Sequence, residues 1–354
     1  MAPPPNPLPP PKSNQNYVGV SAIEGGIITL PDEAFVSPSN PWDKRSVPSL
    51  AFLIEHPGST MFSRGGVGNS SPYVMFDLGL RKDIEGYLPP QQAHLDNRIP
   101  YRLGPGVASK LEDYELDPGD IDAVILSHVH YDHHGDPEDF DQSLFLVGPG
   151  SKGVLKYGCK GAGSHQCFDP SLLPQDRTVE FPGVGPEYED PDGTLLPDDS
   201  RRQWYWRPVG PFPAGIDLFG DRSVYVINAP GHLPGHINLL CRTGPNKWLY
   251  LAGDTCHDVR ILNGEKEIGT WKDERGRELC IHIDPETAKK SINRIRKLQD
   301  LCRESGQQLE FAHVESIYLA PQTGILTSVL GSKILIDCST IDTAHPVWSA
   351  RDIQ

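Results

Sequence analysis

The chain has 354 residues, of which 37% are hydrophobic and 22% charged, so most of it is expected to be globular with a sizeable core. Its formal net charge of -15 disfavours nucleic acid and anionic membrane surfaces as partners, because like charges repel. Gly and Pro, at 35 residues each, exceed their usual share and predict many turns and long loops rather than a helical bundle.

The first 16 residues are rich in proline and are expected to form a disordered tail. Short apolar stretches follow, separated by Gly, Pro, Ser and Asn as in an antiparallel meander. These stretches cover residues 17–23 with 26–30, 49–55 and 73–77. The spacing of apolar residues in Val107–Leu116 then predicts a helix.

From residue 121 onward, predicted strands alternate with less regular segments. Continuous apolar runs predict buried strands at 121–126, 144–147, 223–227, 247–251 and 309–312. A helix is predicted over Thr287–Cys302, shortly after Asp284. Strands first, then strands with helices, predict a sheet-rich core with helices outside it.

The stretch from 151 to 221 interrupts this order. It is rich in Gly, Pro and Asp, and it carries Trp204 and Trp206. Loops of this length are uncommon unless they are functional, so we expect a long surface insertion in a single domain of residues 17–354. The two tryptophans either line a substrate entrance or pack the insertion onto the domain. The first alternative predicts a small, partly apolar or aromatic substrate.

Four predicted strands are each followed by histidine or aspartate. The strand 121–126 leads into His128-Val129-His130-Tyr131-Asp132-His133, and the other three lead to His232, Asp254 and His313. A sheet can bring such strand ends together on one edge, where ligand sites form. The pattern therefore predicts a binding site built from separate strands.

The residue types in this pattern suit a divalent metal. Imidazole nitrogens and carboxylate oxygens, without an essential thiolate, are typical zinc ligands. His128 and His130 are two apart on extended backbone and point the same way, whereas Asp132 and His133 lie further along the loop. One ion cannot readily take all four at short range, but two neighbouring ions can. We predict two Zn²⁺ ions per chain, with other divalent metals as alternatives.

These motifs resemble those of the metallo-β-lactamase superfamily. The matching pieces are Asp77-Leu78-Gly79, His128–His133, Pro230–His236, Ala252-Gly253-Asp254 and Ala312-His313. The resemblance implies an α+β fold, a four-layer αββα sandwich with the metal site along one edge. It also implies that Asp77 supports a metal histidine. The implied ligand sets are His128, His130 and His232 for one metal, and Asp132, His133 and His313 for the other, with Asp254 as the bridge.

Within the superfamily, the chain looks most like the quorum-quenching lactonases, which act on N-acyl homoserine lactones. The run Pro230–His236 is similar to theirs, as is Asp284-Pro285-Glu286 at the start of a helix. The resemblance implies a hydrolase that opens a lactone ring by attack of a metal-bridging hydroxide on the carbonyl. Asp132 is then a candidate to carry a proton to the leaving group.

One position departs from the lactonase pattern. Those enzymes often carry a tyrosine three residues after the bridging aspartate, where this chain has His257. An imidazole can donate the same hydrogen bond or protonate the leaving group, which makes His257 a candidate catalytic residue. It can equally orient a metal ligand without touching substrate.

Other functions share these residues. A cyclic amide or carbamate (γ-lactam) hydrolase, a lactamase in the broad sense, and a thioesterase also begin with attack on a polarised carbonyl. An oxidoreductase similar to the iron persulfide dioxygenases would use one iron and fewer ligands. A binding protein without catalysis is disfavoured, because every ligand type is retained.

Seven cysteines without a CxxC pair, and no basic and apolar leader, predict a reduced cytoplasmic protein. No apolar run approaches the roughly 18 residues of a membrane span. The oligomeric state is left open, with a homodimer as one alternative.

Overall fold

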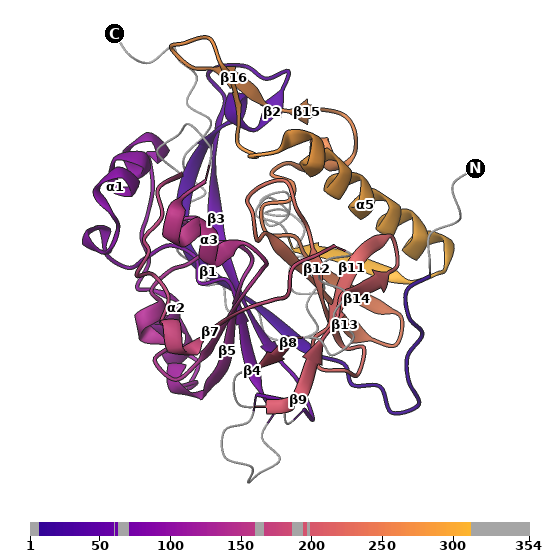
Figure 1. The fold of residues 1–354 in the computed structure, drawn as a ribbon. Coiled ribbons are helices and arrows are strands. Elements are labelled where there is room, and N and C mark those ends of the chain that lie inside the picture. The colour runs from indigo at the N-terminus through magenta and orange to yellow at the C-terminus, as the bar shows by residue number, and fades with distance from the viewer. Residues whose placement is uncertain are drawn as a thin grey trace.

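The computed structural model describes residues 7–59, 61–62, 71–159, 166–185, 194–196 and 199–312. Two six-stranded sheets face each other, and helices cover their outer faces (Figure 1). The predicted αββα sandwich is therefore confirmed. Among the described residues, no helix combines the length and the apolar character that crossing a bilayer requires.

The first sheet has the order β1-β3-β4-β5-β6-β7. The pairs from β1 to β4 are antiparallel, and those from β4 to β7 are parallel. A register shift between Glu24 and Ile27 lets the two predicted N-terminal strands form one long strand. The bounds are β1 Gly19–Pro31, β3 Lys44–Glu55, β4 Tyr73–Phe76, β5 Ile121–Leu126, β6 Leu144–Val147 and β7 Thr178–Glu180.

The second sheet has the order β10-β11-β12-β13-β14-β18. All its pairs are antiparallel except β14 with β18, which are parallel. The bounds are β10 Arg207–Val209, β11 Phe212–Asp217, β12 Val224–Asn228, β13 Ile237–Gly244, β14 Lys247–Leu251 and β18 Gln308–Ala312.

Five α-helices and three small two-stranded sheets complete the described residues. The helices are α1 Pro89–Leu95, α2 Val107–Glu112, α3 Ser151–Tyr157, α4 Val259–Leu262 and α5 Pro285–Glu304. The small sheets pair β2 Val36–Ser37 with β15 Glu267–Ile268, β8 Thr194–Leu196 with β9 Asp199–Trp204, and β16 Thr270–Lys272 with β17 Glu278–Cys280.

Alternation along the strands produces the layers, because successive side chains point to opposite faces. In β5, Ala123 and Ile125 face the second sheet, whereas Val124 and Leu126 pack under α2 and α3. The outer face of the second sheet packs against α5 through residues such as Ile295 and Leu298. Both faces of β5 are thus buried, as its continuous apolar sequence predicts.

Much of the segment 151–221 is part of the sandwich. It supplies α3, strand β7 of the first sheet, and strands β10 and β11 of the second. Trp204 is only 2% exposed, lies in the core between the sheets and donates to Leu218 O. The description of the whole segment as a surface insertion needs correction: short strands separated by Gly and Pro still pair when neighbouring strand edges are available.

The described part of the proline-rich segment, residues 7–16, packs on the domain. Leu8 is buried beside the second sheet, and Pro9 O accepts a hydrogen bond from the Arg242 guanidinium. Lys12 Nζ donates to Gly220 O at 2.8 Å. This packing of residues 7–16 differs from the disorder that was expected for residues 1–16. Proline carbonyls remain good hydrogen-bond acceptors, and Leu8 is buried against apolar residues of the second sheet.

The loop before His232 is bound closely to the start of α5. Ile283 N donates to His232 O at 3.0 Å, and Asp284 N donates to Gly231 O at 2.9 Å. Gly231 has a φ of 131°, and a Cβ there would lie 2.3 Å from Ala288 N. The approach of loop and helix therefore requires glycine at this position.

Replacing Gly231 by Ala is expected to lower the free energy of unfolding by at least ~2 kcal/mol, because strain and a backbone clash add. Urea or thermal unfolding measures this. Gly153→Ala is the control, since Gly153 lies in α3 with nothing within 4 Å of the added Cβ, and alanine favours helix by about 0.5–1 kcal/mol. Equal stability of both variants would contradict the proposed packing.

Candidate metal centre

The loops that carry the predicted ligands are bonded to one another. Ile237 N, at the start of β13, donates to Ser127 O at 2.9 Å and so joins the second sheet to the loop after β5. Asp254 N donates to His236 Nε2 at 2.9 Å. The first bond joins loops that are more than a hundred residues apart in the sequence, and the second ties the loop of Asp254 to that of His232 and His236.

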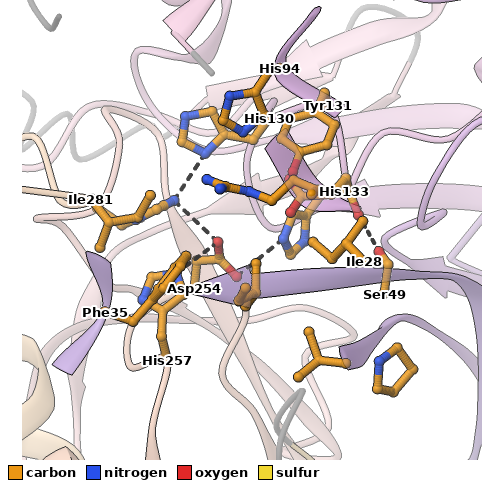
Figure 2. A pocket seen from close by; sticks show the side chains of 16 residues that line it. Ile28, Phe35, Ser49, His94, His130, Tyr131, His133, Asp254, His257 and Ile281 are labelled. Atoms are coloured by element: carbon orange, nitrogen blue, oxygen red, sulfur yellow. Dashed lines mark hydrogen bonds and ion pairs between the residues drawn. The ribbon is translucent and has the colours of Figure 1, made fainter. Parts of the chain in front are cut away.

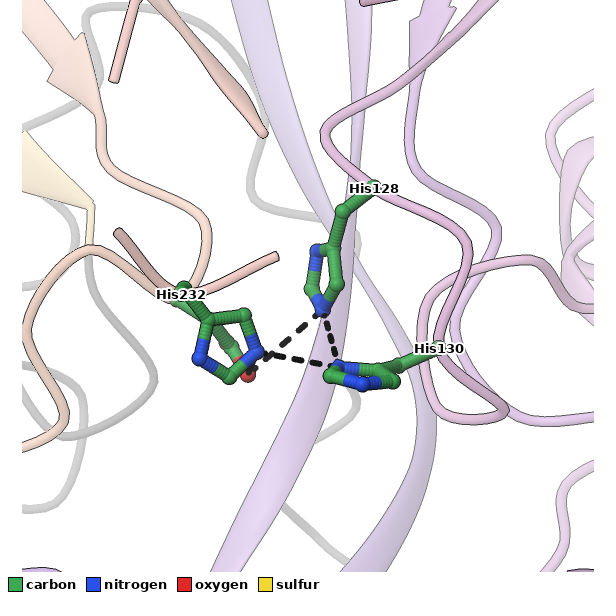
Figure 3. Close-up of side chains that lie close together, drawn as sticks. His128, His130 and His232 are labelled. Carbon is green, nitrogen blue, oxygen red and sulfur yellow. Dashed lines mark hydrogen bonds and ion pairs between the residues drawn. The ribbon is translucent and has the colours of Figure 1, made fainter. Parts of the chain in front are cut away.

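Three imidazole nitrogens converge at this place (Figure 3). His128 Nε2 lies 2.9 Å from His130 Nδ1, which lies 2.9 Å from His232 Nε2. Asp254 Oδ2 lies 3.3 Å from His232 Nε2 and 3.8 Å from His128 Nε2. In a tetrahedral zinc site, bonds of about 2.0–2.1 Å separate the ligand atoms by roughly 3.3 Å. The four side chains therefore fit one metal ion.

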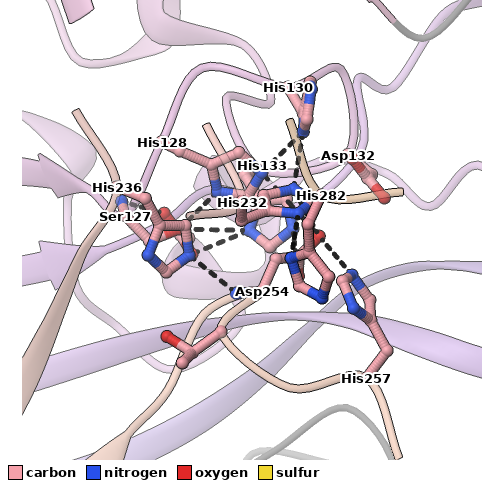
Figure 4. A network of polar contacts seen from close by, with 12 residues as sticks. Ser127, His128, His130, Asp132, His133, His232, His236, Asp254, His257 and His282 are labelled. Carbon is pink, nitrogen blue, oxygen red and sulfur yellow. Dashed lines mark hydrogen bonds and ion pairs between the residues drawn. The ribbon is translucent and has the colours of Figure 1, made fainter. Parts of the chain in front are cut away.

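Asp254 faces two groups of histidines at once (Figure 4). Its Oδ2 lies toward His232 and also 3.1 Å from His257 Nε2, whereas its Oδ1 lies 3.1 Å from His133 Nε2. Burial raises the pKa of this carboxyl, but the charges of His133 and His257 override that and hold it well below its ordinary value. An ionised carboxylate with two oxygens facing opposite ways is suited to bridge two cations.

His128 and His232 have the protonation state that metal binding requires. Burial lowers the pKa of His128 and of His232 well below the ordinary value. Their rings are therefore neutral at pH 7, and a neutral imidazole has the lone pair that a metal needs.

His133 lies between two carboxylates. Its Nδ1 is 2.9 Å from Asp77 Oδ2, and its Nε2 faces Asp254. Burial lowers its pKa, but the charges of Asp254 and Asp77 outweigh burial and raise it well above the ordinary value. This position favours a positive charge, which either a proton or a metal cation can supply.

Asp77 fixes the orientation of His133, as its motif predicts. Its φ of 60° is left-handed, and its Oδ1 accepts a hydrogen bond from Ser127 N at 2.6 Å. With both oxygens engaged, Asp77 holds one ring nitrogen of His133 and directs the other toward Asp254.

The second predicted ligand set is only partly described. Asp132 is half-buried in the lining of the same cavity, and its backbone carbonyl accepts a hydrogen bond from Ser49. Its carboxylate is not among the groups of three or more converging ligand atoms found in the described residues. His313 lies outside the described residues, directly after β18.

No family model matches the chain. Its curated relatives include a cytochrome P450 monooxygenase, mpaDE', of Penicillium brevicompactum, which is 30% identical over 73% of this chain and 28% of that protein. A second relative is the Gamma-lactamase MBL2 of Gibberella moniliformis, 31% identical over 52% of this chain and 70% of that protein. The chain belongs to the metallo-β-lactamase superfamily. It spans little more than a quarter of the first relative.

Solved structures of the same fold agree with this assignment to the superfamily. A structure of an N-acyl homoserine lactone hydrolase, with the product N-hexanoyl-L-homoserine at its catalytic metal centre, superimposes with a TM-score of 0.54. The two chains are 16% identical, and the match covers 85% of this chain and 96% of the other. At this identity the likeness shows the shared fold.

Most of the candidate metal ligands line a cavity, among them His130, His133 and Asp254 (Figure 2). The lining also includes apolar side chains, such as Ile28, Phe35 and Ile281. Trp204 and Trp206 are not among its lining residues, so of the two alternatives for these tryptophans, packing is correct. The cavity therefore combines apolar side chains with candidate metal ligands in one lining.

His257 lines this cavity beside Asp254. Its ring centroid is 5.1 Å from that of Phe35 and 5.2 Å from that of His232. The hydrogen-bonding distance to Asp254 suits an orienting role, and the position in the cavity suits contact with substrate.

His282 is a buried neighbour that no sequence pattern indicates. Its Nδ1 lies 3.3 Å from His232 Nδ1, and burial lowers its pKa well below the ordinary value. Because His232 Nε2 faces the cluster, His232 Nδ1–H can donate to the neutral His282 ring. Such a bond fixes the tautomer that leaves Nε2 free for a metal.

Replacing His282 by Leu is therefore expected to weaken metal binding by about 10–100-fold, because His232 loses the acceptor that orients it. Chelator competition, followed by metal analysis, measures the affinity. His282→Asn is the matched control, since its side-chain oxygen can replace Nδ1 as the acceptor and should restore most of the affinity. Equal affinity in the wild type and the Leu variant would show that His282 has no orienting role.

Proposed function

We propose that the chain is a metal-dependent hydrolase that opens the ring of a small lactone. The observation that carries the proposal is the convergence of three imidazole nitrogens and the Asp254 carboxylate beside a partly apolar cavity. The superfamily relationship and the shared fold with a lactone hydrolase support the same chemistry.

We propose two zinc ions as the cofactor. His128, His130 and His232 would hold one, and Asp132, His133 and His313 the other, with Asp254 shared between them. The nitrogen and oxygen donors and the two-sided position of Asp254 support this assignment. When bound, such ions polarise a carbonyl oxygen and lower the pKa of water toward neutrality.

The chain's own residues would position the substrate and move protons. The apolar side chains of Ile28, Phe35 and Ile281 in the cavity lining would contact the apolar part of the ring. Asp132, which lines the cavity, would carry a proton from the attacking water to the leaving alkoxide. His257, which lines the cavity beside Asp254, would donate a hydrogen bond to the substrate.

A cyclic amide is the second candidate substrate. The relative named Gamma-lactamase MBL2 supports it, because lactam and lactone opening begin with the same attack on a carbonyl carbon. The difference lies in the leaving group, since an amide nitrogen must be protonated before it departs.

A hydrolysis panel of acyl-homoserine lactones, aromatic lactones, γ-lactams and thioesters tests the function. We expect turnover of at least one cyclic substrate by the zinc-loaded protein. His130→Ala should reduce it by at least about a thousandfold, because the cluster loses one of its three nitrogens. Chelation should abolish activity and added zinc restore it in the wild type, but not in the variant. Full activity of His130→Ala would refute the metal mechanism.

His257→Phe separates the two roles of His257. We expect kcat to fall about 10²–10⁴-fold with metal content unchanged, because a donor to the reacting group is lost. His257→Gln, whose amide can replace Nε2 as a donor, should retain more activity. Loss of metal along with turnover would instead assign His257 to ligand orientation, and unchanged kcat would exclude a catalytic role.

A further inference from the structure

Arg98 is a buried cation in the lining of the cavity that the candidate metal ligands share. The residue is 9% exposed, and its Nε has no hydrogen-bond partner. In the described part of the chain, no carboxylate lies within ion-pair distance of its guanidinium, which interacts with the Tyr131 ring hydroxyl. Removing a guanidinium from water is costly unless an anion compensates it.

The backbone around Arg98 is held in place. Arg98 ends the short 3₁₀ helix Asp96–Arg98, and the following residues bond to β1. Arg102 N donates to Ile27 O, and Ile27 N donates to Arg102 O, both at 2.8 Å. Thr29 Oγ1 donates to Pro100 O at 2.6 Å. The same strand places Ile28 and Leu30 in the cavity wall, so Arg98 has a fixed place relative to that wall.

Asp132, which lines the same cavity, is an alternative partner for this charge. Arg98 is close enough to favour the ionised form of Asp132, but the two side chains do not form an ion pair. Under the proposed function Asp132 binds a metal ion, which compensates its negative charge. The Arg98 guanidinium then lines the cavity without a carboxylate partner among the described residues.

We propose that Arg98 binds a carboxylate carried by the substrate. This inference rests on the proposed function and names its substrate class: a small cyclic ester or amide whose apolar ring carries a carboxylate away from the bond that is cut. The guanidinium fork matches a carboxylate in two parallel hydrogen bonds. The apolar side chains in the same lining, such as Ile28, Phe35 and Ile281, would contact the ring.

A matched pair of substrates tests the proposal: dihydrocoumarin, and dihydrocoumarin with a carboxylate on its aromatic ring. We expect a wild-type kcat/KM at least about tenfold higher for the carboxylate, because hydrogen bonds to charged groups contribute on this scale. Arg98→Gln should remove this preference, mainly through KM, and Arg98→Lys should retain part of it. No preference in the wild type, or an equal loss on both substrates in Arg98→Gln, would overturn the proposal.

Binding of unreactive anions distinguishes failure of this inference from failure of the proposed function. Calorimetry on the zinc-loaded protein compares benzoate with isophthalate, whose second carboxylate can reach Arg98. We expect isophthalate to bind about tenfold more tightly, and Arg98→Gln to abolish the difference. If neither lactone is hydrolysed but the Arg98-dependent gain persists, the function is wrong and the anion site stands. If isophthalate binds no more tightly than benzoate, the anion site is refuted, whether or not either lactone is hydrolysed.

Discussion

The carboxylate of Asp254 is buried between two groups of histidines, and a buried carboxylate is stable only with positive charge beside it. His232 and His128 face one side, and His133 faces the other. Metal cations supply such charge more strongly than protonated imidazoles do. The charge balance around this one group therefore explains why so many histidines converge here.

The packing of the two sheets and the bonds between their loops allow these histidines to converge on Asp254. The two sheets pack through an apolar core, and their loops meet through specific backbone bonds such as Ile237 N to Ser127 O. Gly231 lets the His232 loop approach α5 closely, and Asp77 and His282 orient the rings of His133 and His232. The cluster is thus held by neighbours outside its four converging side chains, which is how precise sites are usually supported.

Local sequence pattern predicts a sheet-rich core with helices outside and most of the cluster, whereas the four layers were implied by the resemblance to the superfamily. Buried strands such as 121–126 are recognisable as apolar runs. The candidate ligands are found because they come directly after such strands in the sequence. The strands β7, β10 and β11 are missed, since they are short and lie among Gly and Pro, and strand β13 is missed as well. Arg98 and His282 are missed because their partners come from distant segments, which no spacing in the sequence encodes. The cytoplasmic location and the oligomeric state stay predictions.

The proposed chemistry depends on a site for two metal ions that share Asp254. Metal analysis of the purified protein, by mass spectrometry after removal of loosely bound ions, tests this site most directly. We predict two zinc ions per chain, falling to one or none when Asp254 is replaced by Ala. A single iron per chain, with no second metal bound on titration with zinc, would refute the shared site and favour an oxidoreductase.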